Sequence, residues 1–301
     1  TSLRKITEEV VKMGKHAYLI MAHNDWDLLS KLFRCLDDKR NSLFVHIDKK
    51  SEFNPNLVFK PKNAECVFIN RRKVSWGGYS QIAVELDLLS AALEAGTFDY
   101  YHLISGQDLP LKGQDYIHTF FEQNAGKNFI LFDANAEKNH LVEERFQQYH
   151  FLQNSIGRNS GLWIAFLERV ERLSISIQKS LKVNRISKYP HKVYKGGNWF
   201  SITHEMASYV VSRKNDIKKW FNYSLCADEL FLQTVAMESP LRETIIDDSL
   251  REIDWERGKP YTYRSDDYEL LMSSHNLFAR KFSSDIDKNI IEMVYENAVS
   301  K

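Results

Sequence analysis

The segment between residues 74 and 111 constrains the fold of this chain most strongly. It begins with a glycine-containing turn, VSWGGYS at residues 74–80. An apolar stripe at helical spacing follows, formed by Ile82, Leu86, Leu89 and Leu93. A short apolar run then ends at the polar sequence SGQDLP, residues 105–110. Turn, helix, strand and polar loop in this order form the middle of a βαβ unit, whose ligands bind at the carboxyl ends of the strands.

The same alternation of strands and helices extends to both sides of that segment. Strand-like runs lie at residues 16–23, 42–48, 65–70 and 128–133, and helices are predicted after the first run and at 116–123. The C-terminal half is more elaborate. It contains a strand at 196–203 that begins with two glycines, and a C-terminal helix at 285–299. Between them, one helix is predicted to bear Met206, Val210, Ile217 and Trp220. This pattern predicts an α/β fold with a mixed, mostly parallel central sheet flanked by helices.

The chain has 301 residues and contains no internal repeat, low-complexity tract or clear linker. It is long enough for one large α/β domain, which we place at residues 15–301. Residues 1–14 are interpreted as a leader or an N-terminal extension.

Charge and cysteine usage exclude several classes of protein. The formal net charge of +1 creates no global field for nucleic acid, so we expect no nucleic-acid partner. The three cysteines, Cys35, Cys66 and Cys226, are far apart in the sequence. They indicate neither a disulfide framework nor a cysteine zinc site, and they favour a reducing cytosol. No run of about 18 apolar residues occurs, so no membrane-spanning helix is expected.

The segment at residues 156–195 allows two interpretations. Its first part has apolar residues at helical spacing, and its second part, 179–195, contains lysines and arginines with almost no acidic residues. Such a segment is typical of a core helix followed by a solvated basic loop, which is the simpler interpretation. It is also typical of a helix that lies on an anionic membrane surface, which would give peripheral membrane contact through residues 160–195.

Two carboxylates, Asp228 and Glu229, stand at the start of a predicted helix that continues with an apolar run, residues 230–232. Carboxylates in a first helical turn are stabilised by backbone N–H groups and by the helix dipole, which is a sufficient structural explanation. The same environment favours ionisation. A carboxylate at this place is therefore also suited to act as a general base near neutral pH.

The sequence FARKF, residues 278–282, places Arg280 and Lys281 between aromatic residues, and Arg264 lies upstream in YTYRS. Fixed cations of this kind suit a diphosphate, because a departing nucleotide develops negative charge that must be neutralised. A solvated basic turn is the alternative.

Common metal-binding and nucleotide-binding motifs are not found. HExxH, GxxxxGK[ST] and GxGxxG do not occur, and the ten histidines show no ligand spacing. The D-x-D pairs, Asp25/Asp27 and Asp285/Asp287, stand where helix caps are expected. We therefore expect no bound catalytic metal.

Several of these segments occur together in the order of one known family. The motifs are VHIDKKS (45–51), VSWGGYS (74–80), DYYHLISGQDLPL (99–111), KGGNWF (195–200), ADELFL (227–232) and FARKF (278–282). With them the chain resembles the core-2/I-branching β-1,6-N-acetylglucosaminyltransferase family, which also contains the peptide xylosyltransferases. The resemblance runs from about residue 15 to 285. It implies an inverting glycosyltransferase of GT-A type that uses a UDP-sugar as donor, without the metal-binding D-x-D motif and without a cofactor.

The resemblance also implies roles for single residues. Glu229 corresponds to the base that deprotonates the acceptor hydroxyl, and Lys281 to the lysine that neutralises the nucleotide diphosphate. Arg264 is the best match for an arginine that partners this lysine.

Further residues are expected around the donor and the acceptor. Asp48 and the turn at Trp76 and Gly77 would lie at the nucleotide end, and Asp108 would help to hold the donor. For the acceptor, the resemblance implies the following residues: Trp255, whose indole would stack on a sugar ring, and a charged cluster of Glu143, Glu144 and Arg145.

The chain differs from the animal members of that family, since it lacks their membrane anchor, their stem and their many cysteines. We therefore expect a bacterial cytoplasmic enzyme, peripheral at the inner face of the membrane, that acts in surface polysaccharide synthesis. GlcNAc is the favoured sugar, and the acceptor is a glycan or a lipid-linked oligosaccharide. A non-catalytic sugar- or nucleotide-binding module and a glycoside hydrolase, which needs paired carboxylates, remain as alternatives.

Overall fold

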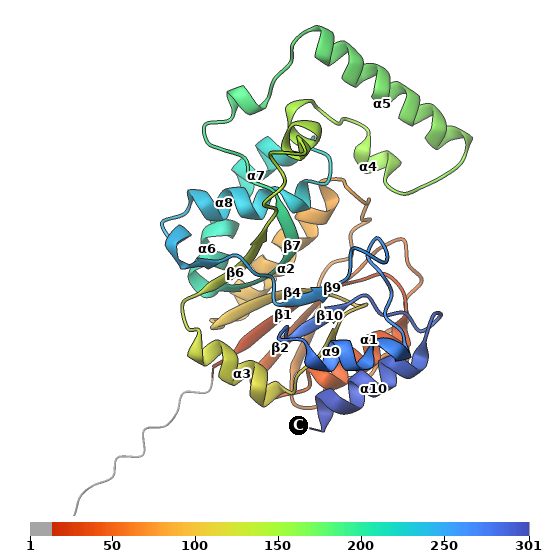
Figure 1. Cartoon of the computed structure of the whole chain (residues 1–301), viewed down its shortest axis with the longest axis vertical. Helices are drawn as coiled ribbons and strands as arrows, with labels where there is room; N and C mark the ends of the chain where they lie inside the picture. Colours follow the sequence, from red (N-terminus) through yellow and green to blue (C-terminus); the bar gives the residue numbers. More distant parts are fainter. Residues whose placement is uncertain (1–13, 301) are drawn as a thin grey trace, which may run out of the picture.

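The computed structural model describes residues 14–300 (Figure 1). Residues 1–13 and residue 301 lie outside the described part of the chain, and with them lies nearly all of the segment interpreted as a leader.

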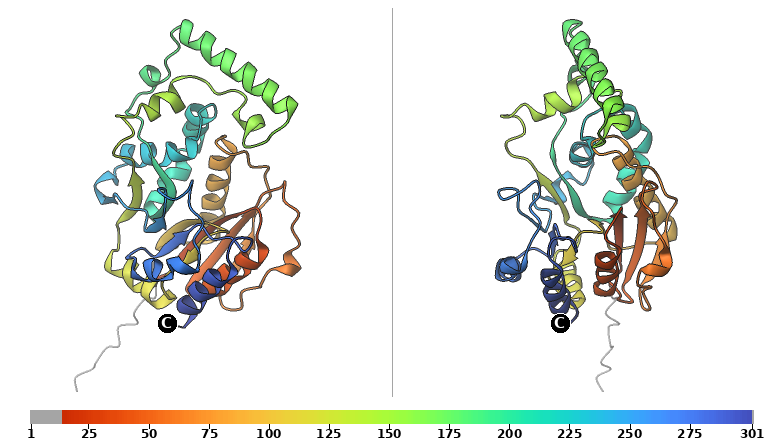
Figure 2. Two further views of the ribbon diagram at one scale, coloured as in Figure 1. Left: turned by 45° about the vertical axis from the view of Figure 1, so that its right-hand side comes forward. Right: turned by 90° about the vertical axis from the view of Figure 1, so that its right-hand side faces the viewer.

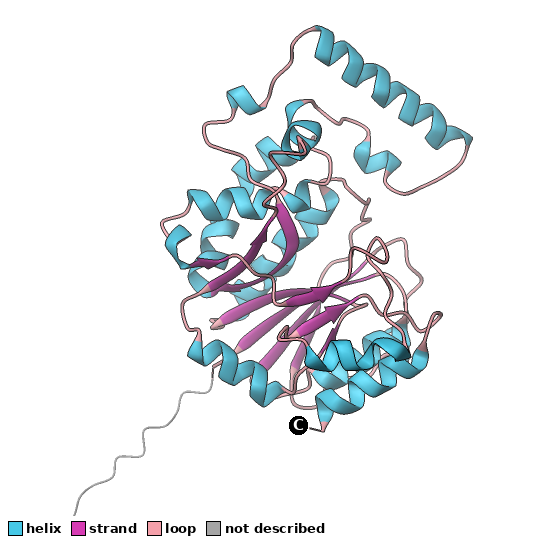
Figure 3. Ribbon diagram, viewed as in Figure 1, coloured by secondary structure: helices cyan, strands magenta, loops and turns pink. Residues whose placement is uncertain are grey.

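A mixed sheet of seven strands forms the centre of the fold, in the order β3-β2-β1-β4-β7-β6-β8 (Figure 3). Its strands are β1 (His16–Ala22), β2 (Asn41–Ile47), β3 (Glu65–Phe68), β4 (Tyr100–Ser105), β6 (Asn128–Phe132), β7 (Gly196–Thr203) and β8 (Ile245–Ile246). Only β7 runs antiparallel to its neighbours, β4 and β6. The expected mixed, mostly parallel sheet is therefore confirmed.

Helices cover both faces of this sheet. They are α1 (Trp26–Cys35), α2 (Ser80–Ala95), α3 (Gln114–Gln123), α6 (His204–Ser212), α7 (Lys214–Phe221), α8 (Phe231–Glu238), α9 (Tyr268–Ser273) and α10 (Lys288–Val299). The single helix expected to bear Met206 and Trp220 is in fact two, because the chain breaks between α6 and α7 at Arg213. Two more helices, α4 (Gln153–Ile156) and α5 (Leu162–Ser180), stand apart from the sheet.

The core lies on both sides of the sheet, because successive side chains of a strand point to opposite faces. On β1, Tyr18 and Ile20 pack with α1, α3 and α10, whereas Ala17 and Leu19 pack with α2, α6 and α8. Strands buried on both faces contain nearly continuous apolar runs, which is why the sequence of β1 shows no alternation of polar and apolar residues.

A second, small sheet in the order β5-β10-β9 joins the C-terminal part to the central sheet. Its strands are β5 (Leu109–Pro110), β9 (Arg251–Ile253) and β10 (Phe278–Arg280). β10 pairs parallel to β9 and antiparallel to β5, and β5 immediately follows the loop after β4. The FARKF motif is thereby brought next to the carboxyl end of β4.

The junction of the two sheets is made by the buried guanidinium of Arg251. Its Nη2 donates to the carbonyl oxygens of Leu103 on β4, at 3.1 Å, and Phe200 on β7, at 2.7 Å. Its Nη1 donates to Ser201 Oγ at 2.8 Å and to the carbonyl of Ser249. Burial lowers the pKa of Arg251 to about 10, so the group is still a cation at neutral pH.

α2 carries a carboxyl group into the core. Glu85 is buried, and neither of its carboxyl oxygens has a hydrogen-bond partner in the described part of the chain. Burial, and then the charge of Asp228, raises the pKa of Glu85 well above its ordinary value. The side chain is therefore protonated in the folded protein at moderate pH.

We predict that Arg251→Met destabilises the protein by about 3–5 kcal/mol, because it leaves several buried acceptors without their donor. The free energy of unfolding in urea measures the loss. Arg242→Met is the matched control, since Arg242 is mostly exposed and, among residues 14–300, its side chain pairs only with its neighbour Glu243. Equal stability of the two variants would contradict the role of Arg251 as the junction.

The free energy of unfolding is expected to fall as the pH rises from 5 to 8, and we predict that Glu85→Gln makes this fall smaller. The carboxyl group of Glu85 releases its proton in the unfolded chain but keeps it in the folded one, so stability falls as the pH rises, by up to about 1.4 kcal/mol per pH unit. Glutamine stays neutral in both states, and it loses no hydrogen bond here.

Urea unfolding at pH 5, 6.5 and 8 checks this prediction, with Glu205→Gln on the exposed side of α6 as the control. The pH dependence that comes from Asp228 remains in both variants. An unchanged pH slope in Glu85→Gln would contradict the assignment.

Candidate active site

Several residues that the sequence singles out lie at one edge of the central sheet. Asp48 directly follows β2, the SGQD loop follows β4, and Asp133 follows β6. Because β7 is antiparallel, its first residues, from Gly196, lie at this same edge. This is the edge at which open α/β sheets bind their ligands.

Glu229 lies at this edge between two cations. Its Oε2 accepts a hydrogen bond from Arg145 Nη1 and lies 3.4 Å from Lys195 Nζ. Lys195 also pairs with Asp133 Oδ2 at 2.9 Å. Among the described residues nothing is hydrogen-bonded to Oε1, and the side chain is 31% exposed. The carboxylate is thus oriented through one oxygen, while the other is available to a substrate.

Asp228, the neighbour of Glu229, is placed very differently. It is buried, and its Oδ2 accepts a hydrogen bond of 2.9 Å from Gln81 Nε2 on α2. Burial, and then the charge of Glu229, raises the pKa of Asp228 to about 7. The expectation that this environment favours ionisation is therefore wrong for Asp228. The reason is that residues 227–229 form a 3₁₀ turn before α8, which buries Asp228 instead of placing it in the first turn of a helix.

The glycine turn supports this 3₁₀ turn from behind. The carbonyl of Gly77 accepts a hydrogen bond of 2.8 Å from the backbone N–H of Cys226. Gly77 has a φ of 69°, which favours glycine, and a Cβ on Gly78 would lie 2.3 Å from Asn154 Oδ1. The two glycines therefore allow the turn, the carboxylate pair and the start of α4 to approach one another closely.

Trp76 lies at the same turn and is partly exposed. Gln153 Nε2 donates to its carbonyl at 2.9 Å, and the guanidinium of Arg158 lies 4.2 Å from the centre of its ring. The segment that leads from α4 to α5 is thus held directly against the glycine turn.

A cluster of cations lies around Lys281. Burial lowers the pKa of Lys281, and the charges of Arg280 and Arg158 lower it further. Arg280 packs over Trp199, with 4.2 Å between its guanidinium and the ring centre, and lies 3.7 Å from Asp108 Oδ1. Positive charges that destabilise one another in this way are relieved by a bound anion, and a diphosphate suits them.

Two aspartates that the sequence places near the donor have structural contacts. Asp108 is buried, and its carboxylate accepts hydrogen bonds from the backbone N–H of Ser105 at 2.8 Å and from its Oγ at 2.6 Å. Asp48 accepts from the backbone N–H groups of Lys50, at 2.9 Å, and Val74, at 3.3 Å. Asp48 thereby ties the end of β2 to the glycine turn, and Asp108 shapes the loop under Arg280.

Of the remaining predicted site residues, the structure places only some next to Glu229 or Lys281. Arg145 contacts Glu229 directly, whereas Glu144 and Trp255 are exposed. Arg264 lies on the exposed loop before α9, beside Tyr263, whose backbone N–H donates to the carbonyl of Lys281. The charges that act on Lys281 come from Arg280 and Arg158, so the role of Arg264 stays a prediction.

One aspartate of each D-x-D pair caps a helix, as expected. Asp25 accepts a hydrogen bond from the N–H of Leu28 at the start of α1, and Asp287 does the same for Asn289 and Ile290 at the start of α10. Within residues 14–300, no group of three or more His, Cys, Asp or Glu side chains gathers in a way that could hold a metal ion.

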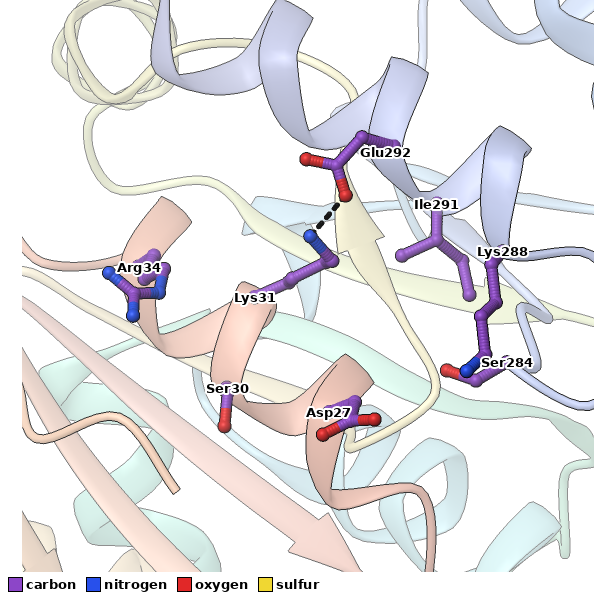
Figure 4. A pocket seen from close by; sticks show the side chains of 8 residues that line it. All are labelled: Asp27, Ser30, Lys31, Arg34, Ser284, Lys288, Ile291 and Glu292. Atoms are coloured by element: carbon purple, nitrogen blue, oxygen red, sulfur yellow. Dashed lines mark hydrogen bonds and ion pairs between the residues drawn. The ribbon is translucent and has the colours of Figure 1, made fainter. Parts of the chain in front are cut away.

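Two hollows lie outside the residues around Glu229. One is a groove between α1 and α10, crossed by the ion pair of Lys31 and Glu292 (Figure 4). The other is a cleft of about 790 Å³ beside the glycine turn. Its cationic lining consists of Lys49, Lys50, Arg71, Arg72, Lys73 and Lys218, and no carboxylate lines it.

Sequence reasoning missed two residues of the site. Lys195 was recognised only as part of a motif and of a basic stretch, although it lies beside Glu229. Arg158 was not singled out at all. No local signal identifies it, because its contact with Trp76 joins residues far apart in the sequence.

Comparison with known proteins agrees with the motifs. Residues 16–276 match the family model of the Core-2/I-Branching enzyme. Xylosyltransferase 2 of Rattus norvegicus is 22% identical over 307 aligned residues, which cover 92% of this chain and 33% of the relative. Xylosyltransferase 2 of Homo sapiens shows the same identity and coverage. Xylosyltransferase 1 of Rattus norvegicus is 22% identical over 87% of this chain and 33% of its own length.

The chain thus spans about a third of the length of these curated relatives. The family match together with the mixed central sheet confirms the expected GT-A-like fold. Because the match extends over most of the sequence, from β1 to the residues just before β10, the chain belongs to the core-2/I-branching enzyme family.

Proposed function

We propose that the protein is an inverting glycosyltransferase that moves a sugar from a UDP-sugar to an acceptor hydroxyl by direct displacement without a metal. The cation cluster of Arg158, Arg280 and Lys281 at the carboxyl edge of the sheet carries this proposal. GlcNAc is the favoured sugar, and the names of the xylosyltransferase relatives make xylose the next to test.

In this reaction Glu229 accepts the proton of the acceptor hydroxyl through Oε1, while Oε2 stays paired with Arg145 and Lys195. The acceptor oxygen forms a bond to the anomeric carbon on the face opposite the nucleotide. The bond between that carbon and the β-phosphate oxygen breaks, and UDP leaves with the electron pair. One displacement of this kind inverts the anomeric configuration.

The leaving UDP gains negative charge as this bond breaks. Lys281 and its two neighbouring arginines supply the fixed positive charge that this step requires, as divalent ions do in other nucleotide sites. The chemistry of the cluster supports a mechanism without a metal, and one carboxylate of each D-x-D pair, Asp25 and Asp287, already serves as a helix cap.

For the acceptor we propose a lipid-linked oligosaccharide of bacterial surface polysaccharide synthesis. The basic cleft beside the glycine turn supports it, because a lipid-linked sugar carries phosphate that such a lining attracts. Lys49, Lys73 and Lys218 have no ion pair within the described residues, so they are available to an anion. The three free cysteines agree with a cytoplasmic location.

We predict that Glu229→Gln lowers the rate of sugar transfer by about 10²- to 10⁴-fold, because glutamine cannot accept the proton. It leaves donor binding nearly unchanged, since the cation cluster is intact. Product formation and UDP binding are measured separately. The control is Glu243→Gln, an exposed residue outside the site. Full transfer activity in Glu229→Gln would refute the assigned base.

We predict that Lys281→Ala lowers UDP release by about 10²- to 10³-fold, the usual cost of removing one group that stabilises developing charge. Release of UDP is assayed over a panel of UDP-sugars, with and without EDTA, and the exposed Lys60→Ala serves as the control. The wild type should resist EDTA.

Loss of UDP release in EDTA would refute the mechanism without a metal. Binding of UDP without product from any donor and acceptor pair would favour a binding module. Hydrolysis of an aryl glycoside in the absence of any nucleotide would favour a hydrolase.

A further inference from the structure

α5 contacts the protein through two buried polar side chains and leaves most of its apolar side chains exposed, which is the reverse of the usual arrangement. Gln178 forms two hydrogen bonds with the backbone of Tyr149, accepting from its N–H at 2.8 Å and donating to its carbonyl at 2.9 Å. Glu171 accepts from the N–H of Leu152 at 3.2 Å. These are the two buried side chains of the helix. The expectation of a core helix in this segment is therefore wrong.

The apolar side of α5 faces the solvent, and the helix projects from the rest of the molecule (Figure 2). The exposed apolar residues follow one another at intervals of three or four and form a continuous stripe. They are Trp163, Phe166, Val170, Leu173, Ile177 and Leu181. Trp163 is 66% and Leu173 61% exposed, and the rings of Trp163 and Phe166 stack with 5.3 Å between their centres. Soluble proteins rarely leave such a stripe uncovered.

The exposed charges around this stripe are mostly positive. The cations are Arg169, Arg172, Lys179, Lys182 and Lys188. From residue 158 to 188 the only exposed acidic residue is Glu168, since Glu171 is turned towards the protein. The whole chain has a net charge of only +1, so this excess is local.

Not every cation of the basic stretch contributes to this surface. Arg185 is buried and donates to backbone carbonyls, among them those of Gln148 and Tyr223 at 3.1 Å. Lys195 pairs with Asp133 and Glu229. The positive surface therefore belongs to α5 and the loops next to it rather than to the entire stretch at 179–195.

We propose that α5 lies on the surface of an anionic lipid bilayer. The apolar stripe enters the boundary between headgroups and acyl chains, with Trp163 and Phe166 as its aromatic anchors. The arginines and lysines beside the stripe contact the anionic headgroups. No helix within the described residues is long and apolar enough to cross a bilayer, so the attachment is peripheral.

This attachment also orients the candidate active site. The segment between α4 and α5 reaches the glycine turn through Gln153 and Arg158, which both contact Trp76. A helix held at a bilayer thus fixes the site near the membrane surface. This step rests on the proposed function, whereas lipid binding by α5 can be tested without any activity.

Co-sedimentation of the full chain with vesicles tests the proposal. Vesicles of phosphatidylcholine with about 30% phosphatidylglycerol are compared with vesicles of phosphatidylcholine alone, at low and high salt. We expect binding to the anionic vesicles that is at least about tenfold tighter and that weakens as salt is added.

Two sets of variants assign the binding to α5. Trp163→Ser with Leu173→Ser should weaken binding to the anionic vesicles at least about tenfold, because it removes apolar area that enters the bilayer. Lys179→Glu with Lys182→Glu should weaken it and remove most of its salt dependence. Leu57→Ser with Leu270→Ser, both exposed elsewhere, is the matched control. Circular dichroism and thermal unfolding verify that the variants remain folded.

Unchanged binding in the Trp163 and Leu173 variant, or equal binding to neutral and anionic vesicles, would overturn the proposal. The three- and four-residue spacing of the stripe also suits pairing with a second copy of the helix. Sedimentation velocity without lipid tests this alternative. A dimer that the serine variant dissociates, together with no vesicle binding, would assign the stripe to self-association instead.

Discussion

The burial of the Arg251 guanidinium between the two sheets is the interaction on which the geometry of the site depends. A buried cation is tolerated only where hydrogen bonds replace its lost hydration, and here carbonyl oxygens of β4 and β7 do so. Arg251 belongs to β9, which pairs with β10, and β10 ends at Arg280. The same contact that joins the sheets therefore sets the position of Lys281 beside the loop after β4.

Side chains of the same chemistry differ in their degree of burial, and they therefore make different contacts. Glu85 and Asp228 lie within the protein, where desolvation raises their pKa values, whereas Glu229 reaches the surface between Arg145 and Lys195. Arg251 joins the two sheets, whereas Lys281 lies where burial, and then the charges of Arg280 and Arg158, lower its pKa.

Much of this architecture could be predicted from local patterns. The strands of the first half were located to within a few residues, because strands buried on both faces form short apolar runs bounded by polar residues. Asp25 and Asp287 were recognised as caps from their position alone. The break at Arg213 and the 3₁₀ turn at residues 227–229 were missed, since the apolar spacing of a broken helix resembles that of a continuous one.

By itself, the sequence determined the α/β class and the order of the elements, because these depend on residues close together in the chain. Glu229 and Lys281 were nominated through the resemblance of their motifs to those of one known family. Only the tertiary structure decided that Asp228 is buried while Glu229 is partly exposed, that Arg158 acts on Lys281, and that α5 turns its apolar stripe outwards. Burial and charge interactions arise from contacts between distant segments. A helical stripe has the same periodicity whether a core, a bilayer or water covers it.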